Sequence, residues 1–122
     1  MQLKDIIDVI LKVKASGISF EAANPRHEHE AEEWKRAKTP DNKVLIPGMI
    51  TQSTVLVEHP ELVAQRIARF AGVVGRERVI ASADCGFASF AGSNEVHPSI
   101  VWAKFKSLVD GARLASERLW KH

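Results

Sequence analysis

The stretch "KVLIPGMITQSTVLVEHPELVAQRIARFAGVVGRERVIASADCGF" spans residues 43–87 and sets two short apolar runs on either side of a helical pattern. The runs "KVLIPG" at 43–48 and "RVIASA" at 78–83 are typical of short buried strands. Between them, Pro60 opens a predicted helix and Gly75 ends it. Its apolar face consists of Val63, Ile67, Phe70, Ala71 and Val74. This order predicts a parallel β-α-β unit with a right-handed crossover.

The same alternation extends outward on both sides. Apolar residues at helical spacing from Leu3 to Val13 predict a first helix that stops at Gly17. "ISFEAA" at 18–23 follows as a strand broken at Pro25, and "HEHEAEEWKRA" at 27–37 as a helix. Pro98 begins a last helix with a sustained apolar stripe, made of Val101, Phe105, Leu108, Ala112, Ala115 and Leu119. We therefore predict an α/β fold in a single domain over 1–122, with a helix preceding three parallel β-α units.

Polar and reactive residues gather where the predicted strands end. Parallel strands place their carboxyl ends on one edge, here called the strand-end rim and formed by residues 21–24, 48–53 and 82–87. Barrels of the (β/α)8 type keep their active sites on this edge. A complete barrel needs about 250 residues, whereas this chain has 122. The predicted architecture is therefore a partial (β/α)8 (TIM) barrel.

Composition narrows the class of protein. The chain is 45% hydrophobic and 26% charged, and its net charge of +2 arises from bases interspersed with acids, so nothing indicates nucleic-acid binding. No run is as apolar as a membrane span, and "MQLKDIIDVILKVK" does not resemble a signal peptide. The single cysteine, Cys85, agrees with a reducing compartment. We expect a cytoplasmic protein with no membrane partner.

Three segments carry a resemblance to a known family: "SFEAANPRHEHEAEEW" (19–34), the stretch from Val44 to Phe87, and "VHPSIVWAKFKSLVDGARLASERLW" (96–120). In one collinear order, they resemble the carboxyl-terminal part of the cobalamin-independent methionine synthase family. They are most similar to its shorter relatives, methionine synthase II and epoxyalkane:coenzyme M transferase. The resemblance implies a (β/α)8 barrel enzyme of methionine biosynthesis in which zinc activates a thiol, such as homocysteine, for alkylation by a donor.

The resemblance also assigns residues. Glu21 matches a glutamate ligand of the zinc, and Cys85 matches the cysteine of the family's "DCG" segment. The family's His-x-Cys ligand pair has no counterpart, so the resemblance covers only the last three β-α units. It implies a truncated or half-barrel form that needs a partner chain or a homodimer to supply the remainder. The residues expected to contact substrate are Asn24, Arg26, His27, Asp84 and Gly86.

The loop after "VLIPG" departs from the family. Relatives place a histidine there as a proton donor, whereas this chain has Gln52 and Ser53, neither of which is a general acid near neutral pH. His59 precedes Pro60 and is better interpreted as a helix cap. The catalytic proton donor therefore stays open, and the loops at 48–54 and 86–92 are expected to shape the substrate cleft.

Alternative interpretations remain for each feature. Cysteine is often a small buried hydrophobe, and Glu21 shares a strand face with Ser19 that could be turned to solvent. His27 and His29 are two apart and cannot chelate one metal from a helix. The whole chain could be a noncatalytic half-barrel that self-associates through open strand edges. A decarboxylase of the uroporphyrinogen type shares the barrel but gives no reason for a cysteine at this position.

Overall fold

The computed structural model describes residues 1–88, 92 and 96–121. Its strands are β1 (Gly17–Phe20), β2 (Val44–Ile50) and β3 (Ser82–Ala83), and they form one three-stranded sheet in the order β1-β2-β3. Both strand pairs are parallel, with Gly17 opposite Val44 and Gly48 opposite Ser82. The predicted α/β class with parallel β-α units is confirmed.

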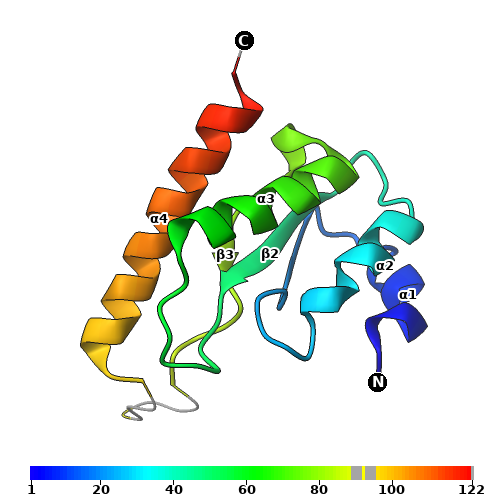
Figure 1. Ribbon diagram of the computed structural model, residues 1–122. Coiled ribbons are helices and arrows are strands. Elements are labelled where there is room, and N and C mark those ends of the chain that lie inside the picture. Colours follow the sequence, from blue (N-terminus) through cyan, green and yellow to red (C-terminus); the bar gives the residue numbers. More distant parts are fainter. Residues whose placement is uncertain (89–91, 93–95, 122) are drawn as a thin grey trace.

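The helices lie around this sheet (Figure 1). In that view α3 (Pro60–Val74) crosses in front of β2, with α4 (Pro98–Leu119) on one side and α1 (Ile7–Ile10) and α2 (Ala31–Arg36) on the other. Short 3-10 turns occupy Leu3–Asp5, Glu28–Glu30 and Arg76–Arg78. None of the helices in the described part of the chain is both long and apolar enough to cross a bilayer.

Helix α3 has the boundaries that its sequence predicts. The imidazole of His59 accepts a hydrogen bond from the backbone N–H of Glu61, which caps the helix start, and Gly75 ends the helix with a φ of +95°. Every residue of its predicted apolar face is buried. Gly111 allows α4 to pack closely against α3, since a Cβ at this position would overlap Val63.

The hydrophobic core lies between the sheet and the helices. Leu45 and Met49 of β2 are fully buried, as is Val63 of α3. Phe20 at the end of β1 stacks on Trp34 of α2 with 4.3 Å between ring centroids. The core thus fixes β1 and β2 against α2 and α3, and these elements carry two of the three loops of the strand-end rim.

The first helix is much shorter than predicted. Residues from Leu3 to Val13 form a 3-10 turn and the single-turn helix α1, and Gly17 begins β1 instead of ending a helix. Lys43 explains the difference, because its Nζ lies 2.6 Å from the carbonyl oxygens of both Val13 and Ala15. The Lys43 ammonium group, directly before β2, thus holds the carbonyls of the segment that leads into β1.

The third strand is also shorter than the predicted 78–83. Arg78 belongs to a 3-10 turn, and its guanidinium donates to the carbonyls of Lys43 and Val74. Val79 forms an isolated bridge with Leu45 before β3 begins at Ser82. Residues 78–83 therefore run beside β2, but β3 itself begins only at Ser82.

The stripe predicted for α4 is confirmed in part. Ala115 is buried, and Leu108, Ala112 and Leu119 are partly buried against the core, whereas Phe105 is exposed. Three positions outside the predicted stripe are buried as well: Lys104, Ser107 and Gly111. Lys104 is tolerated inside because its Nζ donates to Glu58 Oε1 at 2.9 Å and to the carbonyl of Leu56 at 2.7 Å. A polar contact thus sets the rotation of the longest helix.

Candidate functional site

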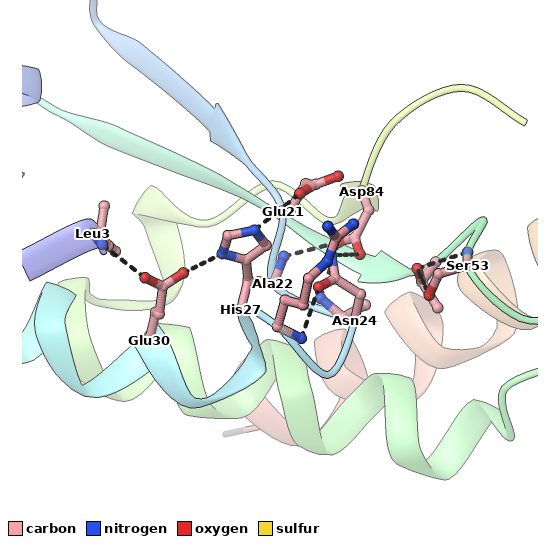
Figure 2. Close-up of polar contacts among 11 residues, drawn as sticks. Leu3, Glu21, Ala22, Asn24, His27, Glu30, Ser53 and Asp84 are labelled. Carbon is pink, nitrogen blue, oxygen red and sulfur yellow. Dashed lines mark hydrogen bonds and ion pairs between the residues drawn. The ribbon is translucent and has the colours of Figure 1, made fainter. Parts of the chain in front are cut away.

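Asp84 lies directly after β3, and its carboxylate reaches across β2 to the end of β1 (Figure 2). Oδ1 accepts from the backbone N–H groups of Ala22 and Ala23 at 2.8 and 2.9 Å, and Oδ2 accepts from Asn24 Nδ2 at 2.9 Å. The carboxylate is buried and bonded by three donors. Asp84, predicted as a substrate contact, therefore joins two loops of the strand-end rim.

This crossing passes over Gly48 of β2. A Cβ at Gly48 would overlap Asp84 Oδ1 and lie 2.7 Å from Asp84 Cα. Only glycine leaves room for the carboxylate, which gives the Pro47-Gly48 pair a structural reason. Glycine inside a strand often marks the close approach of another group. Gly48 was therefore the one feature of the sequence that could have predicted this contact.

Asn24 is the second buried member of the arrangement. Its side-chain oxygen accepts from the backbone N–H of Arg26 at 3.0 Å, and its backbone carbonyl accepts from the N–H groups of His27 and Glu28. The segment after β1 is therefore a tight turn built on one asparagine. Of the three residues predicted to contact substrate here, Asn24 is buried, Arg26 is exposed and His27 is half-buried.

Glu21, His27 and Glu30 form a row of polar side chains (Figure 2). His27 Nε2 lies 3.3 Å from Glu21 Oε2, and His27 Nδ1 lies 2.5 Å from Glu30 Oε1. Glu30 Oε2 in turn accepts from the backbone N–H of Leu3 at 2.9 Å. The imidazole therefore bridges two carboxylates and holds Glu21, a residue at the end of β1, from the side of the 3-10 turn that precedes α2.

Cys85 follows Asp84 directly and is exposed. Its Sγ lies 3.5 Å from the carbonyl oxygen of Gly86, which is exposed as well. The alternative interpretation of Cys85 as a small buried hydrophobic residue is wrong, because the side chain is exposed. Part of the loop predicted at 86–92 falls on residues 89–91, which lie outside the described residues.

Gln52 and Ser53 lie in the loop after β2. The hydroxyls of Thr51 and Ser53 are 2.9 Å apart, and the N–H of Ser53 donates to Thr51 Oγ1 at 3.1 Å. Gln52 Oε1 is buried, with no hydrogen-bond partner among residues 1–88, 92 and 96–121. The N–H of Thr51 donates to Glu58 Oε2 at 2.8 Å, which links this loop to the buried Glu58–Lys104 pair.

The donor set limits what the chain alone can bind. Glu21 and Cys85 supply a carboxylate and a thiol, which are both accepted zinc ligands. A tetrahedral site needs further ligands, and no group of three His, Cys, Asp or Glu side chains is arranged to hold a metal ion within the described ranges. The residues present therefore fit zinc in type but do not complete a zinc site.

The sequence interpretation missed two parts of this region. It placed Asp84 and Asn24 among substrate contacts without the link between them, and it did not identify Glu30 or the Glu58–Lys104 pair. These contacts join residues far apart in the chain, for example 62 positions between Ala22 and Asp84. The composition of one segment carries no information about such a partner.

Comparison with known proteins gives the fold a relative. A comparison with protein-family models finds no match, and a comparison with curated sequences finds none. Among solved structures, the chain is similar to a B12-independent methionine synthase from Shewanella sp. W3-18-1, determined in complex with selenomethionine. The TM-score is 0.81 at 18% sequence identity, and the match covers 98% of this chain and 32% of that chain. The chain thus has the fold of about one third of that enzyme.

Proposed function

We propose that this chain is the carboxyl-terminal part of a (β/α)8 barrel of the methionine synthase type. The observation that carries the proposal is the match in fold over 98% of the chain to a B12-independent methionine synthase. The collinear resemblance of its three segments to that family supports it independently. The open edges of β1 and β3 agree with a sheet that continues into strands from elsewhere.

In this proposal the chain serves a zinc-dependent thiol S-alkyltransferase, and Glu21 and Cys85 are two of the metal ligands. The remaining ligands come from a partner chain or a second copy, because residues 1–88, 92 and 96–121 do not complete the set. Bound zinc would lower the pKa of a substrate thiol and so favour the nucleophilic thiolate. In a completed site, the sulfur of such a thiolate would bond to the alkyl carbon of the donor as the bond between that carbon and its leaving group breaks.

The chain's own residues have positioning tasks in this scheme. Asp84 fixes the backbone at Ala22 and Ala23, one residue beyond Glu21, and is itself adjacent to Cys85. His27 orients the Glu21 carboxylate through its Nε2 contact. Both proposed ligands are therefore held by groups that do not depend on the metal, which preorganises this edge of the sheet.

A second candidate function comes from the exposed apolar surface. Ile80 beside β3 and Trp102, Phe105 and Val109 on α4 are all exposed. A noncatalytic half-barrel that self-associates would bury these residues together with its open strand edges. This alternative has the same fold as the first proposal but no alkyltransferase activity.

Native mass spectrometry of the purified chain separates the two functions, since it gives zinc content and subunit number together. The alkyltransferase proposal expects about one zinc per chain or per dimer. That zinc should be lost in Cys85→Ser and retained in His59→Ala, because His59 only caps α3. A metal-free oligomer would support the noncatalytic alternative. A metal-free monomer would contradict that alternative and also the form of the proposal in which a second copy of this chain supplies the missing ligands.

A further inference from the structure

A cavity of about 470 Å³ opens between the segment after β1 and the loop that leads from β2 into α3. Its volume is within the range of about 300–1,000 Å³ typical of small-molecule sites. Pro25, Leu56, Val57 and Leu62 supply its apolar lining. Neither proposed zinc ligand lines it. Thr51 and Ser53 belong to the loop at 48–54 that is expected to shape the substrate cleft, but the inference below is argued from the lining of the cavity alone.

The loop on one side of the cavity presents apolar residues to solvent. Val55, Leu56 and Val57 are consecutive and exposed, and Leu56 is 74% exposed. Leu62, one turn into α3, is exposed beside them. A run of exposed apolar side chains around a cavity marks a binding surface more often than isolated exposed residues do.

A buried network holds this loop in place. Lys104 Nζ on α4 donates to the carbonyl of Leu56 at 2.7 Å and to Glu58 Oε1 at 2.9 Å. Glu58 Oε2 accepts from the N–H of Thr51, and the Ser107 hydroxyl donates to the carbonyl of Glu58. The loop is thus fixed at its beginning, middle and end, and its apolar side chains are held at the cavity instead of packing into the core.

Three charged groups that line the cavity, those of Arg66, Glu28 and Glu58, have partners of opposite charge, and the imidazole of His59 also belongs to the lining. Arg66 Nη2 lies 3.2 Å from Glu28 Oε1, and Arg66 Nη1 donates to the carbonyl of Met49 at 2.9 Å. Glu58 is neutralised by Lys104 from behind. A charged ligand would lose its hydration without gaining an unpaired opposite charge. The hydroxyls of Thr51 and Ser53 remain as polar groups of the lining.

We propose that this cavity binds an uncharged small molecule with an apolar body and one hydrogen-bonding group. The apolar body packs against Leu56, Val57 and Leu62, and the polar group meets the hydroxyls of Thr51 and Ser53. A segment of another protein chain is the competing occupant, and the experiment below separates the two.

The test uses two fluorescent probes that differ by one charge. N-phenyl-1-naphthylamine is uncharged, and 1-anilinonaphthalene-8-sulfonate carries a sulfonate on the same ring system. We expect the uncharged probe to bind the full chain saturably, at one site per chain, and about tenfold more tightly than the sulfonate, because the guanidinium of Arg66 in the lining is already paired with Glu28. Non-saturable binding, or tighter binding of the sulfonate, would overturn the proposal.

Matched variants locate the binding. Leu56→Ser removes an apolar wall from an exposed position and should weaken binding about tenfold, while Val109→Ser, at an exposed position on α4, should leave it unchanged. Amide chemical shifts should change at residues 51–62. Equal effects of both variants, or shifts confined to α4, would contradict the site. A change in oligomeric size on Leu56→Ser would assign the cavity to an interface between chains instead.

Discussion

The carboxylate of Asp84 occupies the space above Gly48 that a side chain at that position would fill. Gly48 lies on β2 and Asp84 directly follows the neighbouring strand β3; Gly48 pairs with Ser82, two positions before Asp84. Close approach at this point allows one carboxylate to bond to the loop after β1. The organisation of the strand-end rim therefore depends on the absence of one methyl group.

The first prediction concerns that methyl group. Gly48→Ala should destabilise the fold by about 2–4 kcal/mol, because the added Cβ overlaps Asp84 and displaces a carboxylate bonded by three donors. Urea unfolding followed by circular dichroism measures the change. Gly72→Ala is the control: nothing lies within 4 Å of its Cβ, and alanine in a helix interior should stabilise α3 by up to about 1 kcal/mol. A loss of less than about 1 kcal/mol for Gly48→Ala would show that the carboxylate can move aside.

The second prediction exchanges the partners Asp84 and Asn24. Asp84→Asn sets two amide NH₂ groups against each other and should cost about 1–3 kcal/mol. Adding Asn24→Asp restores one acceptor facing one donor, so the double variant should recover most of the lost stability. Urea unfolding of the three variants gives the coupling energy. Strictly additive effects would mean that the two side chains do not act as a pair.

The third prediction concerns the buried ion pair between α4 and the loop after β2. Lys104→Met leaves the Glu58 carboxylate buried without its cation and should destabilise the chain by about 3–5 kcal/mol. Lys104→Met with Glu58→Gln should recover part of that loss. Lys106→Met on the solvent side of α4 serves as control, since Lys106 is exposed and its surface pair with Asp110 contributes little to stability. Equal losses for Lys104→Met and Lys106→Met would argue against the buried pair.

A fourth prediction follows from the pKa of Glu61. Two hydrogen bonds from Arg118, at 2.7 and 2.8 Å, lower the pKa of the Glu61 carboxyl from its ordinary 4.5 and raise that of Arg118. A carboxyl with a lowered pKa in the folded state stabilises that state above its unfolded pKa, and the stabilisation disappears as the pH falls through the folded pKa.

Thermal unfolding as a function of pH tests this pair. Arg118→Met should lower Tm at pH 7, and the difference from the parent chain should shrink steadily as the pH falls below the ordinary pKa of Glu61. Because both side chains are exposed, about 1 M salt should also reduce the difference at pH 7. A Tm difference that is constant with pH would assign the effect of Arg118 to packing of its aliphatic stem.

The sequence predicts those elements whose signals are local. Pro60 and Gly75 bound α3 because both act on the backbone at the place where they stand. The order of the apolar runs predicts the three strands but not all of their ends, since β1 ends at Phe20 instead of Ala23 and β2 at Ile50 instead of Gly48. The first helix was predicted too long because the contacts that lead Val13 and Ala15 into the sheet come from Lys43, which lies about 30 residues away. The burial of Lys104 on α4 could not be predicted for the same reason, since it requires Glu58 as its partner.

The candidate site shows the same division. The alignment of Glu21, Cys85 and Asp84 on one edge follows from parallel strands, which the sequence predicts. The bridge of His27 between Glu21 and Glu30 depends on the exact path of a turn that Asn24 builds. Side-chain pairing across strands is decided by three-dimensional packing, and no spacing within one segment encodes it.

The long sequence separation of the Asp84 hydrogen bonds also predicts when they form during folding. The bonds to Ala22 and Ala23 close loops of 62 and 61 residues and pass over β2, so they form only after all three strands are aligned. Contacts of such long sequence separation carry a high loop-closure cost and are expected late on the folding pathway. Loss of the Asp84 carboxylate would then accelerate unfolding and leave the refolding rate nearly unchanged. We therefore expect the carboxylate that organises the strand-end rim to slow the unfolding of the native state.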